Sequence, residues 1–384
     1  MSILGEFANS AINIVLLLLF LVPLVVIHEF GHFLVARRAG VKVHEFGIGF
    51  PPRALTFAKD KLGTIYTLNW LPIGGFVKLE GEEGESDDAS AFVNKLLRTR
   101  LLILVAGVAM NFLLAFLIFT FIAQFADPSV AVRVATVQAG SPAEQAGLHG
   151  GVQIGTAKDS HGQDVPVYDE SGDKIVAIDG RQFPWFDDPN APILYLRAHP
   201  SSTVTLLVEH ADGSRTEVRA ATRSAEDIKN GLGALGFTPQ AYTASDSIAR
   251  DPLAALAVGA SRTFDAGTLI LRGLGDFIAN IANPPVSGPV GIAGAIGTIR
   301  ENWPPVFLLW LVGLLSANLA VINILPFPPL DGGRAAVAII QALSNNRIGQ
   351  AAERLVYLTG FVLLMALLVW LTLFDTGILQ RQRL

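Results

Sequence analysis

Four stretches of the chain are apolar over enough residues to cross a lipid bilayer as helices. A spanning helix needs about 20 predominantly apolar residues, because each residue adds about 1.5 Å to its length. The stretches cover about residues 11–36, 101–125, 306–324 and 355–374. This pattern predicts a multi-pass α-helical membrane protein with four transmembrane helices.

Other patterns occupy the segments between these stretches. Residues 62–80 are strand-like and contain the turn signal Gly74-Gly75, which predicts a β-hairpin loop. Residues 126–225 hold strand patterns such as VRVATV and STVTLLVEH beside a short helix, and predict an inserted α+β domain. Residues 253–282 are apolar but carry four charged side chains, so an amphipathic helix or helix pair on the membrane surface is preferred to a further span.

These expected elements divide the chain into four parts. They are the first part of a membrane domain (1–125), the inserted domain (126–225), an amphipathic connector (226–305) and the second part of the membrane domain (306–384). The loop at 37–100 carries ten Lys and Arg residues, whereas the segment before the first span carries none. Because basic loops tend to stay in the cytoplasm, this loop is expected inside and the inserted domain outside.

The composition agrees with a membrane protein that also has soluble mass. Hydrophobic residues make up 51% of the chain and charged residues 16%, against about 25% charged residues in an average soluble domain. The net charge of -5 gives no sign of nucleic-acid binding. The lack of cysteine excludes disulfides, cysteine-bound zinc and thiol catalysis. Residues 1–10 lack the basic start of a secretory signal, so the first stretch is expected to remain as a span.

The first predicted span contains the ionisable sequence HEFGH at residues 28–32. A charged group in a span costs about 2.5–3.5 kcal/mol on insertion scales, so these groups need an explanation. Residues i and i+4 share one face of a helix, so His28 and His32 can bind one metal ion. Glu29 can then act as general base on a water that zinc activates for attack on a peptide bond. The alternative is that these polar groups lie at a helix end and pair with neighbours.

The depth of the two histidines favours the metal site. The helix rise places His32 about 8 Å, and His28 about 14 Å, inside the basic pair Arg37-Arg38 that marks the end of the span. The sequence HEFG recurs at 44–47, but Ile48 stands where a second histidine would be needed, so we expect a loop there. The other histidines fall in the inserted domain and are expected on its surface: His149, His161, His199 and His210.

A catalytic zinc ion needs a third protein ligand and one open position. The best candidate is Asp331 in NILPFPPLDGGR, where prolines interrupt an apolar segment on the side of His32. The alternative is that Asp331 caps the helix that follows. Asn323 precedes the interruption, and it could bind a substrate backbone or satisfy a carbonyl of the unwound segment.

Two motifs of the chain together resemble those of a known family. HEFGH in the first span and N-x-x-P-x-P-x-L-D-G at 323–332 resemble the site-2 proteases, which are intramembrane zinc metalloproteases, and most closely the bacterial branch with the regulator of sigma-E protease. The resemblance covers nearly the whole chain. It implies that zinc (Zn2+) is the cofactor, bound by His28, His32 and Asp331, with Glu29 as the catalytic residue and Asn323 as a substrate-binding residue.

The resemblance also implies a substrate and a location. Gly74, Gly75 and Phe76 belong to a loop that would offer a strand edge to an unwound substrate segment. The expected substrate is a single-span membrane protein, either an anti-sigma factor trimmed beforehand by another protease or a remnant signal peptide. The protein would lie in the bacterial inner membrane, with the active site near the cytoplasmic side and a PDZ-like domain in the periplasm. The lipid bilayer is an expected partner and nucleic acid is not.

Three features depart from the family pattern. The chain has room for only one PDZ-like domain, at about 131–222, with an insertion of about twenty residues at 152–171. The stretch ADPSVAVRV before its first strand has no glycine, so we expect a steric filter rather than capture of a C-terminal carboxylate. The second span reads AGVAMNF where relatives often have a Gly-Pro pair, and Asn111 either faces the active site or packs between helices.

Two functions of other classes compete with a protease. A non-catalytic membrane scaffold with a PDZ-like domain would have no need of Glu29 and Asp331 beside the two histidines. A transporter with an ion site at mid-membrane would show internal repeats and more charged residues within its spans. The sequence has neither of the transporter features, and the protease is the favoured function.

Overall fold

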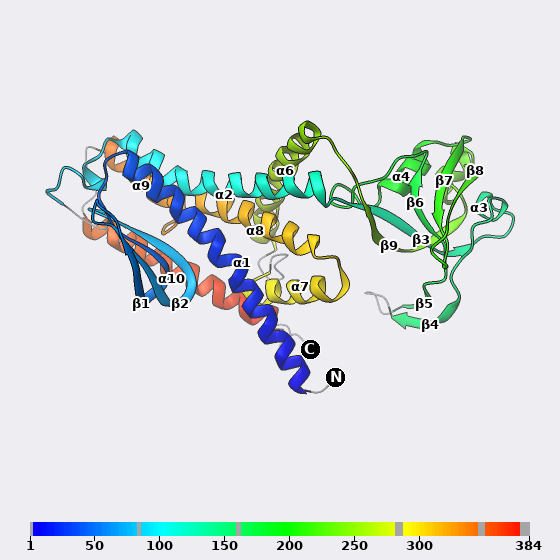
Figure 1. The fold of residues 1–384 in the computed structure, drawn as a ribbon, viewed down its shortest axis with the longest axis horizontal. Helices are drawn as coiled ribbons and strands as arrows, with labels where there is room; N and C mark the ends of the chain where they lie inside the picture. The colour runs from blue at the N-terminus through cyan, green and yellow to red at the C-terminus, as the bar shows by residue number, and fades with distance from the viewer. Residues whose placement is uncertain (1–2, 83–85, 159–162, 281–286, 345–349, 377–384) are drawn as a thin grey trace. The chain divides into compact units, whose positions relative to one another are not determined.

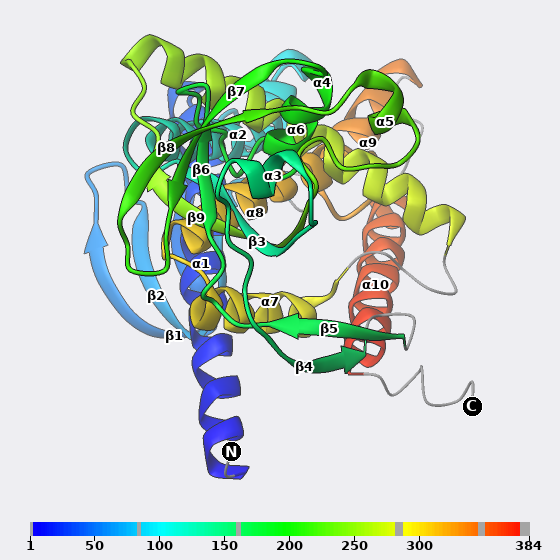
Figure 2. The ribbon, with the colours of Figure 1, turned by 90° about the vertical axis from the view of Figure 1, so that its right-hand side faces the viewer.

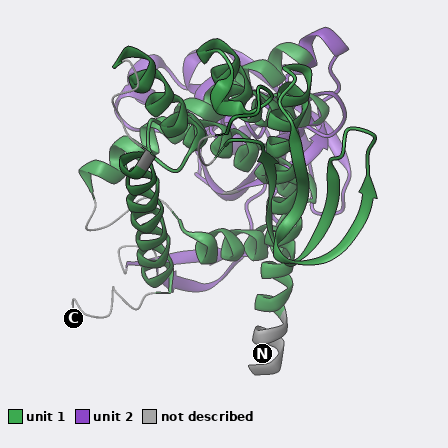
Figure 3. Ribbon diagram, turned by 90° about the vertical axis from the view of Figure 1, so that its left-hand side faces the viewer, with its two compact units in different colours: residues 1–121, 256–384 green, residues 122–255 purple. Residues whose placement is uncertain are grey.

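A computed structural model of the chain describes residues 3–82, 86–158, 163–280, 287–344 and 350–376. The chain forms two compact units (Figure 3). One unit combines Met1–Phe121 with Leu256–Leu384, and the other consists of Ile122–Ala255. The first unit therefore joins the two ends of the sequence, and the second unit is an insertion between them.

Four long helices carry the most apolar stretches of the chain (Figure 1). They are α1 (Ile3–Arg38), α2 (Leu97–Phe125), α8 (Val306–Ile324) and α10 (Gln350–Asp375). Within the described residues, the segments long and apolar enough to cross a membrane are Asn9–Arg38, Leu97–Phe125, Val306–Ile324 and Ala351–Asp375. The four predicted spans are thus confirmed as candidate membrane helices. Large apolar side chains on α1, α2 and α10 are exposed, as a lipid-facing surface requires.

A curved β-hairpin follows α1 in the first unit. Its strands are β1 (Val43–Lys59) and β2 (Ile65–Leu79), which pair antiparallel. The sequence predicted strands only within 62–80 and a loop at 44–47. Residues 44–47 instead belong to β1, because they are flanked by β2 on both sides, with Phe46 paired to both Val77 and Tyr66.

Both strands bend near their middle, so the hairpin forms a sheet of four segments. Residues 43–48 lie between 75–79 and 65–68, and the start of β2 pairs in turn with 53–59. Gly74, which the sequence placed in a turn, lies inside β2 at a φ of 74°, where the pairing register shifts. Among the described residues, segment 75–79 is consequently an edge of this sheet.

Other helices of the described residues complete the first unit. They are η1 (Phe92–Asn94), α6 (Pro252–Ala279), α7 (Pro289–Asn302) and α9 (Asp331–Leu343). The continuous helix α6 covers the expected amphipathic segment, and it is not among the helices apolar enough to span a membrane. Its placement on the membrane surface stays a prediction, and residues 281–286 of the expected connector lie outside the described residues. Helix α7 packs against α1 through Leu17, Ala293 and Ile296.

The second unit is built on a five-stranded sheet with the order β8-β7-β6-β3-β9 (Figure 2). Its strands are β3 (Pro128–Val137), β6 (Lys174–Ile178), β7 (Thr203–Glu209), β8 (Arg215–Ala221) and β9 (Phe237–Ser247). Its helices are α3 (Pro142–Gln145), α4 (Ala191–Ala198) and α5 (Ala225–Lys229). Apolar side chains from the sheet and from α4 form one core, which includes Val132, Leu196 and Leu206.

The inserted domain ends later in the sequence than expected, and its expected insertion forms a hairpin. Strand β9 pairs with β3 along most of its length, so the compact unit extends to Ala255 rather than to about residue 225. The expected insertion at 152–171 forms a separate hairpin of β4 (Gln153–Lys158) and β5 (Asp164–Tyr168). The mixed helix and sheet content agrees with the expected α+β class, and the PDZ-like identity of the domain stays a prediction.

Candidate metal centre

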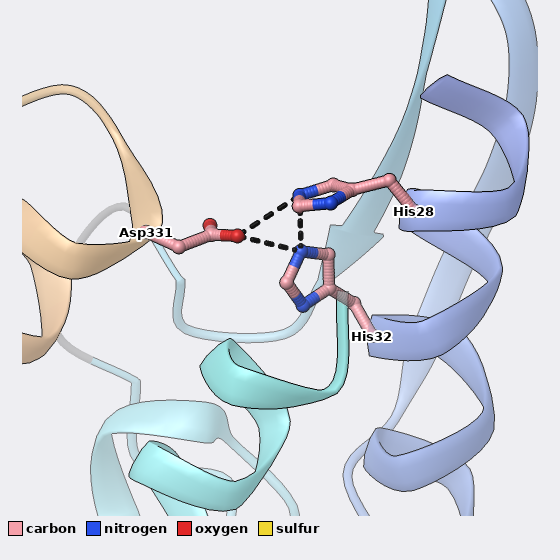
Figure 4. Close-up of side chains that lie close together, drawn as sticks. All are labelled: His28, His32 and Asp331. Atoms are coloured by element: carbon pink, nitrogen blue, oxygen red, sulfur yellow. Dashed lines mark hydrogen bonds and ion pairs between the residues drawn. The ribbon is translucent and has the colours of Figure 1, made fainter. Parts of the chain in front are cut away.

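Three ionisable side chains from distant parts of the sequence meet inside the first unit (Figure 4). His28 Nε2 lies 3.1 Å from His32 Nε2, and Asp331 Oδ2 lies 2.9 Å from the former and 3.1 Å from the latter. Both histidines are buried and Asp331 is largely so. The sequence predicted this set, and the fold brings its three members together.

Local structure explains how each of the three side chains reaches this point. His28 and His32 lie one turn apart on α1, so their rings project from the same face. Asp331 is the first residue of α9, directly after the proline-rich segment 325–330 that ends α8. A side chain on Gly332 would overlap the backbone of Ile324, so glycine permits this tight reversal.

Asp331 does not cap its own helix. The N-cap position of α9 is Leu330, and no side chain makes a capping hydrogen bond there. Asp331 Oδ2 is buried and, among the residues that the structure describes, makes no hydrogen bond; it lies 2.9 and 3.1 Å from Nε2 of His28 and His32. Burial raises the pKa of this carboxyl, but the contacts with His28 and His32 outweigh burial and hold the pKa well below its usual range. The carboxylate is therefore an anion aimed at the histidines.

The donor set fits a zinc ion. Zinc is usually bound tetrahedrally at about 2.0–2.1 Å from histidine nitrogen and carboxylate oxygen, which separates neighbouring ligand atoms by about 3.3 Å. The three separations here, 2.9, 3.1 and 3.1 Å, are close to that value. Three atoms with lone pairs face one point, and a cation there would satisfy all of them.

Helix α2 supports both histidines from behind. The Nδ1 of His32 lies 2.8 Å from the backbone oxygen of Ile103, and the Nδ1 of His28 lies 3.2 Å from the side-chain nitrogen of Asn111. A methyl group on Gly107 would overlap both rings. The sequence left open whether Asn111 faces the site or packs between helices, and the structure places it against His28. Ile103 and Gly107 were not singled out, because one apolar span residue resembles another in sequence.

The metal centre opens into a cleft of about 860 Å³. Glu29 of α1, Asn323 of α8 and segment 75–79 of β2 line this cleft together with the three candidate ligands. Gly75 approaches α1 so closely that a methyl group there would lie 3.8 Å from Cγ of Glu29. Asn323 donates a hydrogen bond from Nδ2 to the backbone oxygen of Leu319 at 2.9 Å.

The other predicted hairpin residues differ in their relation to this cleft. Phe76 lines it, and its ring packs over Gly47 of the neighbouring strand segment. Gly74 is not part of the lining, but a methyl group there would lie 3.2 Å from Phe50 and 3.6 Å from Val25, which both line the cleft. The predicted residues Gly75 and Phe76 thus lie near the metal centre, and Gly74 shapes the strand that carries them.

An ion pair at the rim of the cleft was not singled out from the sequence. Arg334, one turn after Asp331 on α9, pairs with Glu82 in the loop after β2. Both side chains line the cleft, and their pairing joins the hairpin to the helix that carries the candidate aspartate. The only signal in the sequence was that Arg334 follows Asp331 by three residues.

The remaining histidines have structural contacts elsewhere. In the second unit, the buried Asp173 accepts a hydrogen bond from the backbone N–H of His149 at 2.8 Å and contacts His210 Nδ1 at 2.7 Å. Both carboxylate oxygens are therefore already paired. His44 contacts Glu80 at 2.6 Å on the hairpin. His161 lies outside the described residues.

Comparisons with known proteins decide the family. The sequence pattern of Peptidase family M50 matches residues 16–367. The chain belongs to peptidase family M50. This membership confirms the expected resemblance to site-2 proteases and the expectation of a zinc metalloprotease.

The similarity to relatives covers nearly the whole length of both chains. A candidate zinc metalloprotease of Clostridium perfringens is 32% identical over 372 residues, covering 94% of this chain and 98% of that protein. A candidate zinc metalloprotease of Brucella suis is 30% identical and covers 92% of each chain. The zinc metalloprotease RasP of Oceanobacillus iheyensis is 25% identical over 437 residues, covering 91% of this chain and 95% of its own.

Proposed function

We propose that this protein is an intramembrane zinc endopeptidase that cleaves single-span membrane proteins within or beside their span. The observation that carries the proposal is that Asp331 of α9 meets His28 and His32 next to Glu29, and that these last three lie on α1, a helix apolar enough to cross a membrane. A non-catalytic scaffold would gain nothing from this costly set of buried ionisable groups.

The roles of the residues follow from their chemistry. His28, His32 and Asp331 would hold zinc, which acts as a Lewis acid and lowers the pKa of a water molecule toward about 7. Glu29 takes a proton from the attacking water and returns it to the leaving amide nitrogen. Asn323 binds the substrate backbone across the same cleft.

The edge of the hairpin is the proposed docking place for the scissile segment. A transmembrane helix hides its peptide groups in its own hydrogen bonds, so it must unwind before a peptide bond is accessible. Segment 75–79 lines the cleft and is an edge of its sheet, and an unwound segment can pair with such an edge. Gly75 and Phe76 would therefore contact substrate, and Gly74 would place that edge.

The wider context is proposed from the resemblance. The substrate would be an anti-sigma factor already trimmed by another protease, or a remnant signal peptide. The basic loop at 37–100 supports a cytoplasmic location for the hairpin and the metal centre, with the second unit in the periplasm of a bacterial inner membrane. The second unit would act as a PDZ-like steric filter that excludes substrates with large outer domains.

The direct test measures zinc content and cleavage in one preparation. The protein, purified in detergent, should bind one zinc ion and cleave a membrane-span substrate. Glu29→Gln should abolish cleavage while zinc is retained, and Asp331→Ala should weaken both. Cleavage that survives Glu29→Gln would overturn the mechanism, and zinc retained after replacement of both His28 and His32 would place the metal elsewhere.

A further inference from the structure

Asn111 is a fully buried polar side chain in an apolar helix. Its amide nitrogen lies 3.2 Å from Nδ1 of His28, while its amide oxygen is buried and has no hydrogen-bond donor within the described part of the chain. A buried polar atom without a partner costs about 1–3 kcal/mol. An orientation of the amide that gives the oxygen a hydrogen-bond donor should therefore be more stable.

The protonation of His28 determines what Asn111 has to do. A histidine that binds a metal through Nε2 carries its proton on Nδ1, and the group that faces Nδ1 must then accept a hydrogen bond. The Nε2 of His28 is the atom that faces Asp331 and His32. With the amide nitrogen toward Nδ1, the imidazole proton would lie on Nε2, where it would block a metal.

The shape of an amide makes the opposite arrangement available. The oxygen and nitrogen of an asparagine amide occupy nearly the same volume, so a half-turn about the last side-chain bond exchanges them. After that rotation Oδ1 of Asn111 accepts from Nδ1–H of His28. The same rotation provides the unpaired oxygen with a donor.

We propose that Asn111 is a positioning residue that accepts a hydrogen bond from His28 and so fixes the tautomer of His28 that binds zinc. This inference rests on the proposed zinc site. His32 has an equivalent arrangement, because its Nδ1 lies 2.8 Å from the backbone oxygen of Ile103, which can only accept. One helix therefore sets the tautomer of both histidines.

The geometry of α2 makes this double role possible. Ile103, Gly107 and Asn111 follow one another at intervals of four residues, so they lie along one face of the helix. Gly107, in the middle, leaves the space that the two rings occupy. The hydroxyl of Ser316 on α8 donates to the backbone oxygen of Asn111 at 2.8 Å, a contact with the backbone of α2 and not with the Asn111 side chain.

Two substitutions separate an acceptor from a packing residue. Asn111→Leu keeps the volume but cannot accept, and it should weaken zinc binding by about 10- to 100-fold, the range for loss of a partner that orients a metal ligand. Asn111→Asp can only accept, and it should bind zinc within about threefold of the unchanged protein. Ser316→Ala is the matched control, since it removes a neighbouring buried hydrogen bond without touching His28. It should leave zinc affinity unchanged.

The measurement is the zinc dissociation constant of the full chain in detergent, by competition with a chromophoric chelator, with thermal unfolding as the check on folding. A Leu variant that binds zinc as tightly as the unchanged protein overturns the inference, as does a folded Asp variant that loses zinc. If the Leu variant does not fold, the Asp variant alone decides.

Failure of the inference and failure of the proposed function give different results. His28→Ala and His32→Ala are measured in parallel. Zinc that persists in both of these variants refutes the proposed zinc site. Zinc that is lost from them but retained by Asn111→Leu refutes only the role of Asn111.

Discussion

Gly107 of α2 lies directly against the imidazole of His32, with no space between them for even a methyl group. Gly107→Ala should therefore displace the ring and weaken zinc binding at least about tenfold, with an overpacking cost of about 1–3 kcal/mol. Gly273→Ala is the matched control, because that helical glycine of α6 has open space around it. Zinc content and thermal unfolding of both variants check the prediction. Equal zinc affinity in the two variants would contradict it.

Substitution of Phe76 tests whether substrate binds at the cleft-facing edge of the hairpin and not at its other edge. Phe76→Ala should lower kcat/KM for a membrane-span substrate by about fivefold to tenfold, since loss of one aromatic contact costs about 1 kcal/mol or more. Zinc content should stay unchanged. Phe57→Ala, on segment 53–59 at the opposite edge, removes an exposed aromatic ring and should have little effect in detergent. A similar loss in both variants would argue against substrate pairing at segment 75–79.

The ion pair between Arg334 and Glu82 should couple the hairpin to α9. A double-mutant cycle with Arg334→Gln and Glu82→Gln should give a coupling energy of about 0.5–1 kcal/mol in detergent unfolding, because the guanidinium is about one third exposed. The exposed pair Lys158 and Asp164, on the hairpin of β4 and β5, should give close to zero in the same cycle. Zero coupling for both pairs would mean that the rim contact contributes nothing to stability.

Asp375, near the end of α10, accepts a hydrogen bond from the backbone N–H of Gly291 in the first turn of α7 at 2.8 Å. It acts as an N-cap supplied by another helix, and caps are worth about 0.5–2 kcal/mol. Asp375→Ala should lower the thermal unfolding temperature accordingly. Asp375→Asn keeps an acceptor and should recover most of the loss, whereas equal losses would show that charge rather than capping is responsible.

Part of the site could be predicted from sequence because it is local. The spacing of His28 and His32 on one helix face is a property of α1 alone, and the four spans follow from length and apolarity. Asp331 could be chosen only as a candidate, since an aspartate at the start of a helix has a common alternative role as a cap. Its direction toward the histidines depends on how α8 and α9 pack.

Other parts depend on contacts that a sequence pattern does not encode. Residues 44–47 contain no alternating pattern, and they become a strand because β2 flanks them on both sides. The segment of β9 is polar in its second half, so its pairing with β3 was not visible. Asn111 could equally have packed between helices, and only the position of His28 gives its side chain a chemical partner.

The three candidate ligands are divided by the whole second unit, so the ribosome makes the histidine pair long before it makes Asp331. A chain that has inserted only its first two spans therefore carries an incomplete ligand set beside Glu29. If these three residues hold the zinc ion as proposed, a nascent copy would have no complete metal site until α9 has been made. On the same assignment, premature termination anywhere before α9 would leave an inert remnant instead of an unregulated protease.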